Sequence, residues 1–251
     1  MCNLAARIAR GAAAEHPTVL LGLGDSITAG YGASAGHSYF ERLSQTLQAR
    51  DPSLIAMNKA VSGTTSDGPL VALETVVLYG VDERGVVVMT TGGNDIIHNY
   101  GRSAPRELAM YGASWAQARA WIPGYGQRLD GHLSELAPSF PGGCQLYLAN
   151  IYDPTDGHGD IEHAGLPDWP DGSKVLNAYN AVMDGFCRKH AEAHLVDLHR
   201  AFMGHGIHGT SLPLLLRPAD PNYWYYSNLE DPNDRGYAVV YRTFLAAMVG
   251  K

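Results

Sequence analysis

Hydrophobic and polar positions follow one repeating order along this chain: a short apolar run, then a longer stretch with helical spacing. The apolar runs predict five strands, at 18–24, 54–61, 85–93, 144–152 and 194–198. The spaced stretches predict helices at 38–50, 69–79, 114–137, 173–193 and 234–250, the third broken near 122–126. Strands that alternate with helices favour a parallel sheet covered on both faces. We therefore expect an α/β protein with three layers, α/β/α, around a five-stranded parallel sheet.

Two segments fit this alternation poorly, at about 95–126 and about 199–232, and both are rich in Tyr, Trp, Gly and Pro. We interpret them as loop insertions in a single domain that spans 1–251, because 251 residues suit one large domain. An open sheet of this kind, flavodoxin-like in class, binds ligands beyond the carboxyl ends of its strands. The two insertions are therefore candidates for the walls of a substrate pocket.

Composition and charge argue against several classes of partner. The net charge is −7 and no basic run stands out, so no nucleic-acid partner is expected. No run of about 18 apolar residues occurs, so no membrane span is expected. The first 17 residues lack the long apolar core of a signal peptide, which favours a cytoplasmic protein. Three cysteines, Cys2, Cys144 and Cys187, do not predict a disulfide framework, and the last two read as small core residues.

Polar or small residues that suit acyl transfer follow each of the first three strands. Ser26 lies in "GDSITAG", Gly63 in "NKAVSGTT" and Asn94 in "TGGNDII". The fold brings all three to one edge of the sheet. There the Ser26 hydroxyl could attack a carbonyl, and the amides of Ser26, Gly63 and Asn94 could donate hydrogen bonds to the oxyanion. Loss of one such donor typically costs about 10²- to 10³-fold in rate.

Four blocks, "GDS" at 24–26, Gly63, "GGND" at 92–95 and "DPNDRGY" at 231–237, resemble the SGNH hydrolases, also called GDSL-like esterases and lipases. They occur in the family's order and extend over essentially the whole chain. The resemblance implies an ester hydrolase for a small-molecule ester, with Ser26 as nucleophile and with Ser26, Gly63 and Asn94 as the oxyanion hole. It implies neither a cofactor nor a metal. Asp25 and Asp95 are expected to brace their loops by local hydrogen bonds.

The last block departs from the family pattern, which normally reads Asp-x-x-His-Pro-Asn. Asp231 stands in place of the histidine base, and Asn228 stands in place of the aspartate that orients it. Our preferred hypothesis is that Asp231 is the base and that Asn228 donates a hydrogen bond to it, where a second aspartate would repel it. A carboxylate with a pKa near 3.9 is a weaker base than an imidazole near 6.5, unless burial raises the carboxylate pKa.

Two alternatives remain open for the chemistry. A histidine from elsewhere, His98, His205 or His208, could serve as the base. Alternatively, the protein could be a catalytically impaired SGNH-like binding protein for an acyl or carbohydrate ligand. The ester itself is also open, because the family includes lipases, thioesterases and deacetylases of sugars.

Two further stretches each permit a functional and a structural interpretation. Residues 153–163 carry four carboxylates that could surround Ca²⁺ or could simply form turns: Asp153, Asp156, Asp160 and Glu162. The aromatic run at 223–226 could line a pocket or form a small core under a long loop. The "DLHRAF" stretch at 197–202 reads as structural.

The start of the last helix offers a second role for the catalytic candidate. The pattern predicts Asp231 as its N-cap, Pro232 as its first residue and Asp234 facing the positive end of the helix dipole.

Overall fold

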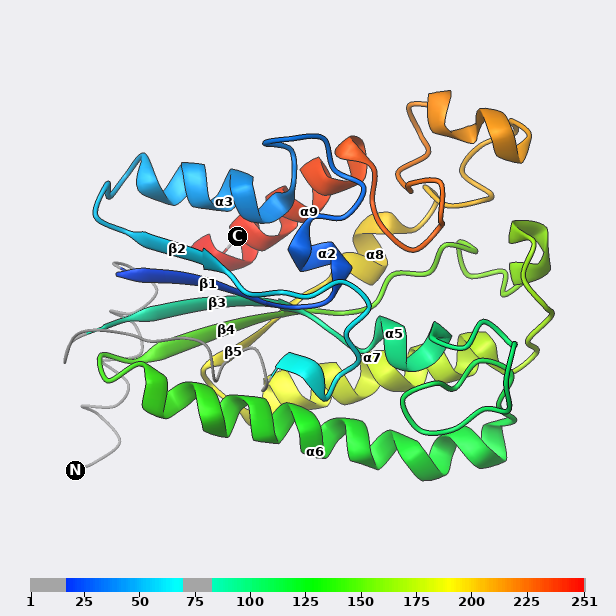
Figure 1. Cartoon of the computed structure of the whole chain (residues 1–251), viewed down its shortest axis with the longest axis horizontal. Helices are drawn as coiled ribbons and strands as arrows, with labels where there is room; N and C mark the ends of the chain where they lie inside the picture. The colour runs from blue at the N-terminus through cyan, green and yellow to red at the C-terminus, as the bar shows by residue number, and fades with distance from the viewer. Residues whose placement is uncertain (1–16, 70–82, 251) are drawn as a thin grey trace.

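The computed structural model describes residues 17–69 and 83–250, and in this part of the chain five parallel strands form one sheet (Figure 1). The strands are β1 (Val19–Gly24), β2 (Ile55–Asn58), β3 (Gly85–Thr90), β4 (Cys144–Ala149) and β5 (Ala193–Val196). Their spatial order, β2-β1-β3-β4-β5, is that of a flavodoxin-like doubly wound sheet. The predicted fold class is therefore confirmed. The first 16 residues and nearly all of the helix predicted at 69–79 lie outside the described residues.

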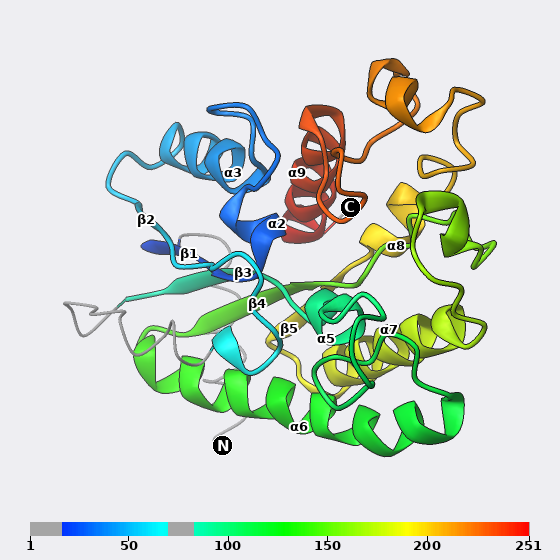
Figure 2. The ribbon, with the colours of Figure 1, turned by 45° about the vertical axis from the view of Figure 1, so that its right-hand side comes forward.

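Helices cover both faces of the sheet (Figures 1 and 2). One face carries α2 (Ser26–Ala29), α3 (Tyr39–Gln48), α8 (Leu198–Phe202) and α9 (Asp234–Val249), and the other carries α6 (Trp115–Ser139) and α7 (Gly172–Lys189). Successive strand residues point to opposite faces, so Leu20 joins the core under α3 and α9, whereas Leu21 joins the core over α6 and α7. The short helix α5 (Gly93–Ile97) follows β3, and η1 (Ile161–Ala164) and η2 (Leu214–Ala219) are single 3₁₀ segments.

The carboxyl ends of β1 and β3 finish level with each other, and this alignment positions the first turn of the site. Gly24 pairs with Thr90 in the parallel register. Its φ is +111°, and a Cβ there would lie 1.9 Å from the Thr90 carbonyl oxygen. Only glycine allows so close an approach of the two strands. The chain therefore turns immediately after β1, and Ser26 begins α2 directly above the edge of the sheet.

Helix α6 corrects one prediction, because it runs unbroken through 122–126 with Pro123 in its interior. An interior proline costs a helix roughly 3 kcal/mol or more. The cost is offset by a continuous buried stripe that includes Ile122, Tyr125 and Leu129, spaced three and four residues apart. Tyr125 also stacks on Tyr179 of α7, with ring centroids 4.4 Å apart. Tertiary packing therefore holds the segment helical where the local sequence suggests a break.

The start of α9 corrects a second prediction: its N-cap is Asn233, not Asp231. Asn233 Oδ1 accepts hydrogen bonds from the backbone amides of Arg235 and Gly236 at 3.0 and 3.1 Å. Pro232 therefore precedes the helix, while Asp234 lies in the first turn as expected. The carboxylate of Asp231 is thus released from capping and is available for another role.

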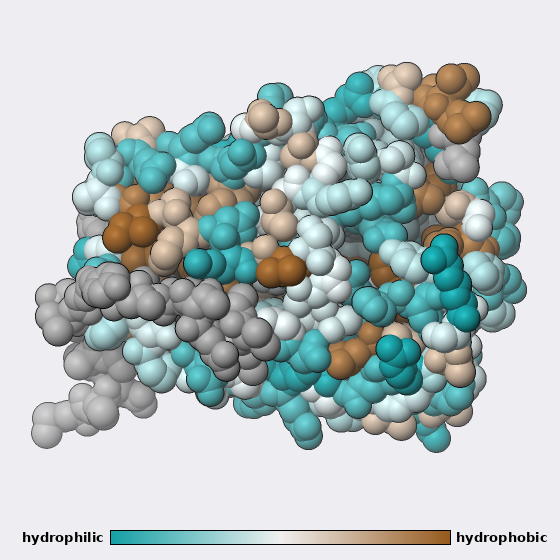
Figure 3. Space-filling model, viewed as in Figure 1, coloured by the Kyte–Doolittle hydropathy of each residue, from teal (hydrophilic) through white to brown (hydrophobic). Residues whose placement is uncertain are grey.

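Other features of the chain concern its surface and its cysteines. Among the described residues, no helix combines the length and the hydropathy that crossing a bilayer requires. Cys144, at the start of β4, and Cys187, in α7, are free thiols that pack against the core but are only half-buried, so they are less enclosed than predicted. Cys2 lies outside the described residues. The face seen in Figure 3 is largely polar with several small apolar patches, one of them at η2, where Leu215 is 92% exposed.

Candidate active site

Ser26 is held at the end of β1 by the residue before it. Asp25 caps α2, since its Oδ1 accepts a hydrogen bond from the Ile27 amide at 3.1 Å. The same oxygen accepts from the Thr90 hydroxyl at 2.6 Å, which ties the turn to β3. Asp25 therefore braces this loop, as expected. Burial, opposed by these hydrogen bonds, raises the pKa of Asp25 to about 7, and the nearby charge of Asp231 adds to the rise.

Two candidate oxyanion donors lie in the loops after β2 and β3. Gly63 has a φ of +82°, and a Cβ built on it would meet nothing within 4 Å, so backbone conformation and not space requires glycine here. Asn94 Nδ2 donates to the Thr64 carbonyl at 2.9 Å, which holds the Gly63 loop and leaves the second amide hydrogen of Asn94 available. The backbone amides of Ser26 and Gly63 donate to no acceptor within the described chain. The three predicted oxyanion donors therefore retain free hydrogens.

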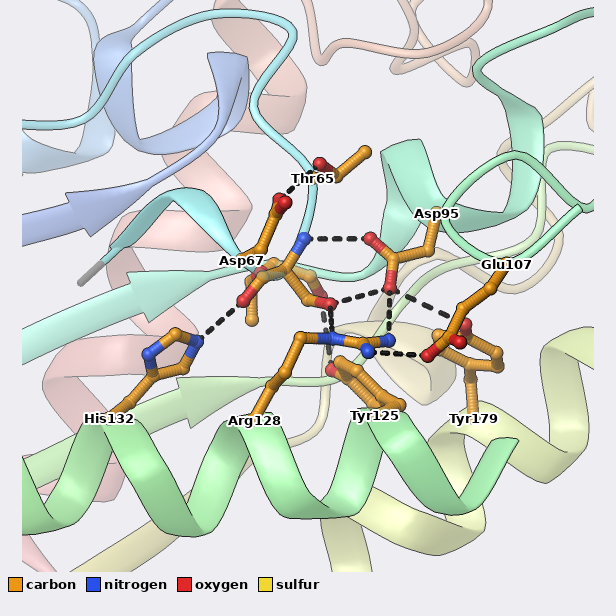
Figure 4. A network of polar contacts seen from close by, with 10 residues as sticks. Thr65, Asp67, Asp95, Glu107, Tyr125, Arg128, His132 and Tyr179 are labelled. Carbon is orange, nitrogen blue, oxygen red and sulfur yellow. Dashed lines mark hydrogen bonds and ion pairs between the residues drawn. The ribbon is translucent and has the colours of Figure 1, made fainter. Parts of the chain in front are cut away.

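A buried polar network fixes the loop that carries Gly63 (Figure 4). Asp95 accepts the Ser66 amide at 2.7 Å through Oδ1 and the Ser66 hydroxyl at 2.6 Å through Oδ2. From α6, Arg128 donates to the Ser66 hydroxyl at 2.6 Å and forms an ion pair with Glu107 at 2.6 Å. Asp95 thus braces the loop as predicted, and Arg128 extends the brace from the loop to the long helix.

His132, one turn further along α6, completes this network. Its Nε2 lies 2.7 Å from the Ser66 carbonyl oxygen, so Nε2 carries the proton and donates. Burial lowers the pKa of His132 to about 4, which keeps the ring neutral at ordinary pH. Figure 4 shows Arg128 and His132 extending from the same helix toward the loop. Neither residue was predicted from the sequence, where their signal is a polar spacing of four along an otherwise buried helical face.

Asn228 and Asp231 form two hydrogen bonds with each other in the loop before α9. Asn228 Nδ2 donates to Asp231 Oδ2 at 2.7 Å, and Asn228 Oδ1 accepts the Asp231 amide at 3.2 Å. Asp231 is only 2% exposed. Its second carboxylate oxygen, Oδ1, is buried and has no hydrogen-bond partner of ordinary geometry among the described residues. The structure therefore shows the Asn228-to-Asp231 hydrogen bond that the sequence suggested.

The electrostatic setting of Asp231 favours a stronger base than an exposed aspartate. Burial raises its pKa, while the side chains of Ser26 and Asn228 act in the opposite direction. This effect of Ser26 on the pKa of Asp231 indicates that the two side chains lie near each other, although they are 205 positions apart in the sequence. No hydrogen bond of ordinary geometry joins them in the described chain.

An apolar cavity opens beside this pair, with a volume of about 160 Å³. Its lining includes four aromatic side chains that the sequence analysis did not single out: Tyr100, Tyr111, Tyr152 and Trp169. They come from the loop after α5 and from the segment between β4 and α7. The first predicted insertion, 95–126, is therefore shorter than expected, because α6 begins at Trp115, but its loop does line the cavity.

The aromatic run at 223–226 has mainly a structural role. Tyr223 and Tyr225 are 2% and 0% exposed and belong to the core under α9. Tyr226 is 40% exposed and packs edge-on against Tyr31. None of the residues of this run lines the apolar cavity. The interpretation as a small core is therefore supported for Tyr223 and Tyr225.

The alternative histidines have other partners. His208 Nε2 lies 2.9 Å from Asp160, and its ring stacks on His158. His205 stacks on Trp224 with ring centroids 3.2 Å apart. His98 is exposed. No hydrogen bond or ion pair joins any of the three to Ser26 or Asp231 in the described chain.

The carboxylates of 153–163 bond to the protein itself. Asp153 accepts the Thr155 amide at 2.8 Å, and Asp156 accepts the backbone amides of Gly204, Gly206 and His208 at 2.9 Å. In the described ranges, no group of three or more His, Cys, Asp or Glu side chains could hold a metal ion. These carboxylates instead join the loop after β4 to the loop after α8.

Comparison with known proteins adds a family and a set of similar folds. Residues 23–239 match the model of the GDSL-like lipase/acylhydrolase family. The structure is similar to that of an alpha/beta hydrolase enzyme from the metagenome of Lake Arreo, Spain, with 21% identity, a TM-score of 0.62, and 92% of this chain and 95% of the other covered. It is also similar to an acetylxylan esterase from Geobacillus stearothermophilus, with 19% identity, a TM-score of 0.59, and coverage of 92% and 94%. No curated protein sequence matches.

At these identities the structural likeness concerns the fold. The similar structures also include catalytic mutants of the Geobacillus esterase at a serine, an aspartate and a histidine.

Proposed function

Because the chain belongs to the GDSL-like lipase/acylhydrolase family, we propose that it hydrolyses carboxylic esters through an acyl-enzyme on Ser26, with Asp231 as the general base. Family membership supports the reaction class. One observation supports the base: Asp231 is held through Oδ2 by Asn228, while its buried Oδ1 has no hydrogen-bond partner in the described chain. A carboxylate fixed through one oxygen can use the other to accept the proton of Ser26.

In the first half of the reaction, Ser26 Oγ attacks the ester carbonyl carbon while its proton passes to Asp231 Oδ1. The carbonyl electron pair moves to oxygen, and the resulting oxyanion accepts hydrogen bonds from the amides of Ser26 and Gly63 and from Asn94 Nδ2. The tetrahedral intermediate then expels the alcohol, which takes the proton back from Asp231. An acyl group remains on Ser26.

In the second half, water attacks the acyl carbonyl and gives a proton to Asp231. The proton returns to Ser26 Oγ as the carboxylic acid leaves, so the enzyme is regenerated. The raised pKa of Asp231 assists both halves, because a base accepts a proton more readily as its pKa approaches the working pH. Burial thus compensates in part for the absence of an imidazole.

Single substitutions test the two assigned roles with p-nitrophenyl butyrate as substrate. Ser26→Ala should abolish hydrolysis, and Asp231→Asn, which is nearly isosteric, should lower kcat/KM by about 10²- to 10⁴-fold. Asp234→Asn is the matched control, because Asp234 bonds to Ser34 on the surface and should leave the rate unchanged. Full activity in Asp231→Asn would remove Asp231 as the base.

A double substitution tests whether the pair at 228 and 231 replaces the family's Asp-x-x-His. Asn228→Asp combined with Asp231→His restores that pattern, and the base then becomes an imidazole. The double variant should retain Ser26-dependent activity and should lose kcat/KM on the acid side through a pKa near 6.5. Both proteins are compared on an Asp25→Asn background, which removes the other group beside Ser26 with a pKa of about 7. On that background the protein with Asp231 should lack the inflection, so an identical pH profile in the two proteins would point to a base elsewhere.

A further inference from the structure

We propose that the apolar cavity beside Ser26 binds an extended, unbranched acyl chain, so that the substrates are medium-chain acyl esters and not acetylated sugars. This inference rests on the proposed function, because it assigns the acyl group that Ser26 would carry. It follows from where the cavity opens, from what lines it and from which of its polar groups are already bonded.

The cavity opens at the catalytic pair. Its lining includes Asp25 and Ile27, the residues on either side of Ser26, and Gly93, which precedes Asn94. It also includes 228–230, the segment directly before Asp231. A carbonyl carbon bonded to Ser26 Oγ would therefore have the cavity directly beside it.

The rest of the lining is mainly aliphatic and aromatic. It comes from α5, the segment between β4 and α7, the starts of α7 and α8 and the loop before α9, and it includes Ile96, Ile97, Ile151, Ile161, Leu176 and Leu198. An exposed apolar cavity of this kind gains free energy when an alkyl chain displaces its water. The lining thus matches a hydrocarbon.

The polar groups of the aromatic lining are already used within the protein. Tyr111 and Trp169 donate to backbone carbonyl groups, and Tyr100 and Tyr152 donate to Glu230 through its side chain and its backbone carbonyl. A sugar ring needs several free donors and acceptors, because each of its buried hydroxyls must be paired. Among the buried lining residues, Thr91 Oγ1 lacks a partner in the described chain, and one hydroxyl is too few for a sugar.

The acyl side of the ester suits this recess better than the alcohol side does. After the first half-reaction the alcohol must leave and water must reach the carbonyl, whereas the acyl chain stays on Ser26. Trp169 and Leu176, which line the recess, are almost fully buried, so the recess reaches into the core and can hold the group that stays. The alcohol would then depart through the open mouth.

A series of p-nitrophenyl esters from acetate to octanoate measures the preference. Each additional methylene that enters the cavity should raise kcat/KM about fourfold, the factor that corresponds to ~0.8 kcal/mol per buried methylene. From acetate to hexanoate, four methylenes, the expected rise is therefore about 250-fold. A parallel series of acetate esters with lengthening alcohols should show no comparable rise, and an acetylated xylose should be hydrolysed no faster than p-nitrophenyl acetate.

Ile161→Trp would fill the cavity from its wall and should lower the octanoate-to-acetate ratio of kcat/KM at least tenfold. Ile161 is half-buried, so the fold tolerates the larger ring. Ile55→Trp is the matched control: Ile55 is 50% exposed at the amino end of β2, opposite the site, and should leave the ratio unchanged. Neutral octanamide should also bind the Ser26→Ala variant more weakly when Ile161→Trp is added.

The outcomes separate the two proposals. Ser26-dependent hydrolysis that does not rise with acyl length, or that rises with alcohol length, overturns the acyl-chain assignment and leaves the esterase intact. Octanamide binding that Ile161→Trp weakens, with no hydrolysis of any ester, supports the cavity as an apolar site and overturns the esterase. A preference for the acetylated sugar overturns the proposed substrate class.

Discussion

Asp25 should make the stability of this protein fall as the pH rises, and Asp25→Asn should remove that fall. The carboxyl of Asp25 is 3% exposed and lies between the Thr90 hydroxyl, the Ile27 amide and the charge of Asp231. Burial is the largest cause of its raised pKa, and the hydrogen bonds only partly oppose it. An asparagine keeps the shape and an acceptor oxygen but cannot ionise.

The size of the effect follows from the difference between the two pKa values. The pKa of Asp25 rises from 3.8 to about 7 in the folded protein, and each unit corresponds to about 1.36 kcal/mol. Between these values the folded state holds a proton that the unfolded state has lost, so the free energy of unfolding decreases with rising pH. The contribution is fully present below about pH 4 and is lost by about pH 7. The total loss is about 4 kcal/mol, of which about 3 kcal/mol falls between pH 5 and pH 8.

Urea unfolding of wild type and Asp25→Asn at pH 5.0, 6.5 and 8.0, followed by tryptophan fluorescence and by circular dichroism, measures this difference. From pH 5.0 to pH 8.0 the free energy of unfolding of Asp25→Asn should rise by about 3 kcal/mol relative to that of the wild type. Asp184→Asn serves as control, because Asp184 forms an exposed ion pair with Arg188 along α7 and should follow the wild type. If Asp25→Asn and wild type lose stability in parallel, Asp25 does not carry the raised pKa.

Two further substitutions test the brace of the oxyanion loop and the cap of α9. Arg128→Met leaves Asp95 buried without its cation and should lower kcat/KM about tenfold and the free energy of unfolding by about 3 kcal/mol. Arg188→Met, at an exposed arginine, is the control and should change neither quantity. A normal kcat/KM in Arg128→Met would show that the network does not support the active site. Asn233→Ala should cost about 1 kcal/mol in thermal unfolding through loss of the cap, and an unchanged Tm would show that the cap is dispensable.

The sheet could be predicted from the sequence because its signal is local. Every residue of β1 and β3 is buried, so each appears in the sequence as an apolar run ended by a glycine or a polar turn. The residues after these strands could be assigned to one edge, because parallel strands place their carboxyl ends together. The two wrong predictions, the break in α6 and the N-cap of α9, concerned features that depend on tertiary contacts. Pro123 stays within α6 because the helix is packed against α7, and Asn233 caps α9 although Asp231 also has a capping side chain.

The apolar cavity could not be predicted from the sequence, for a physical reason. Its walls come from segments far apart in the chain, and no single segment has an unusual pattern. Residues such as Tyr111 and Trp169 lie in irregular stretches, where neither helical nor strand periodicity indicates which way a side chain points. Arg128 and His132 were equally hidden, since a polar residue on a buried helical face is recognisable only once its partner loop is in place.

The Asn228 and Asp231 pair also explains why the two positions must change together. The family pattern, aspartate with neutral histidine, and the pattern here, asparagine with aspartate, carry the same single negative charge. Asn228→Asp alone would set a second carboxylate against Asp231, close to the already buried Asp25, and Asp231→His alone would leave an imidazole without an acidic partner. Each single change is therefore expected to cost more activity than the double change, a non-additivity that a double-mutant cycle on kcat/KM measures directly. Additive losses would mean that the two side chains act independently, which their 2.7 Å hydrogen bond contradicts.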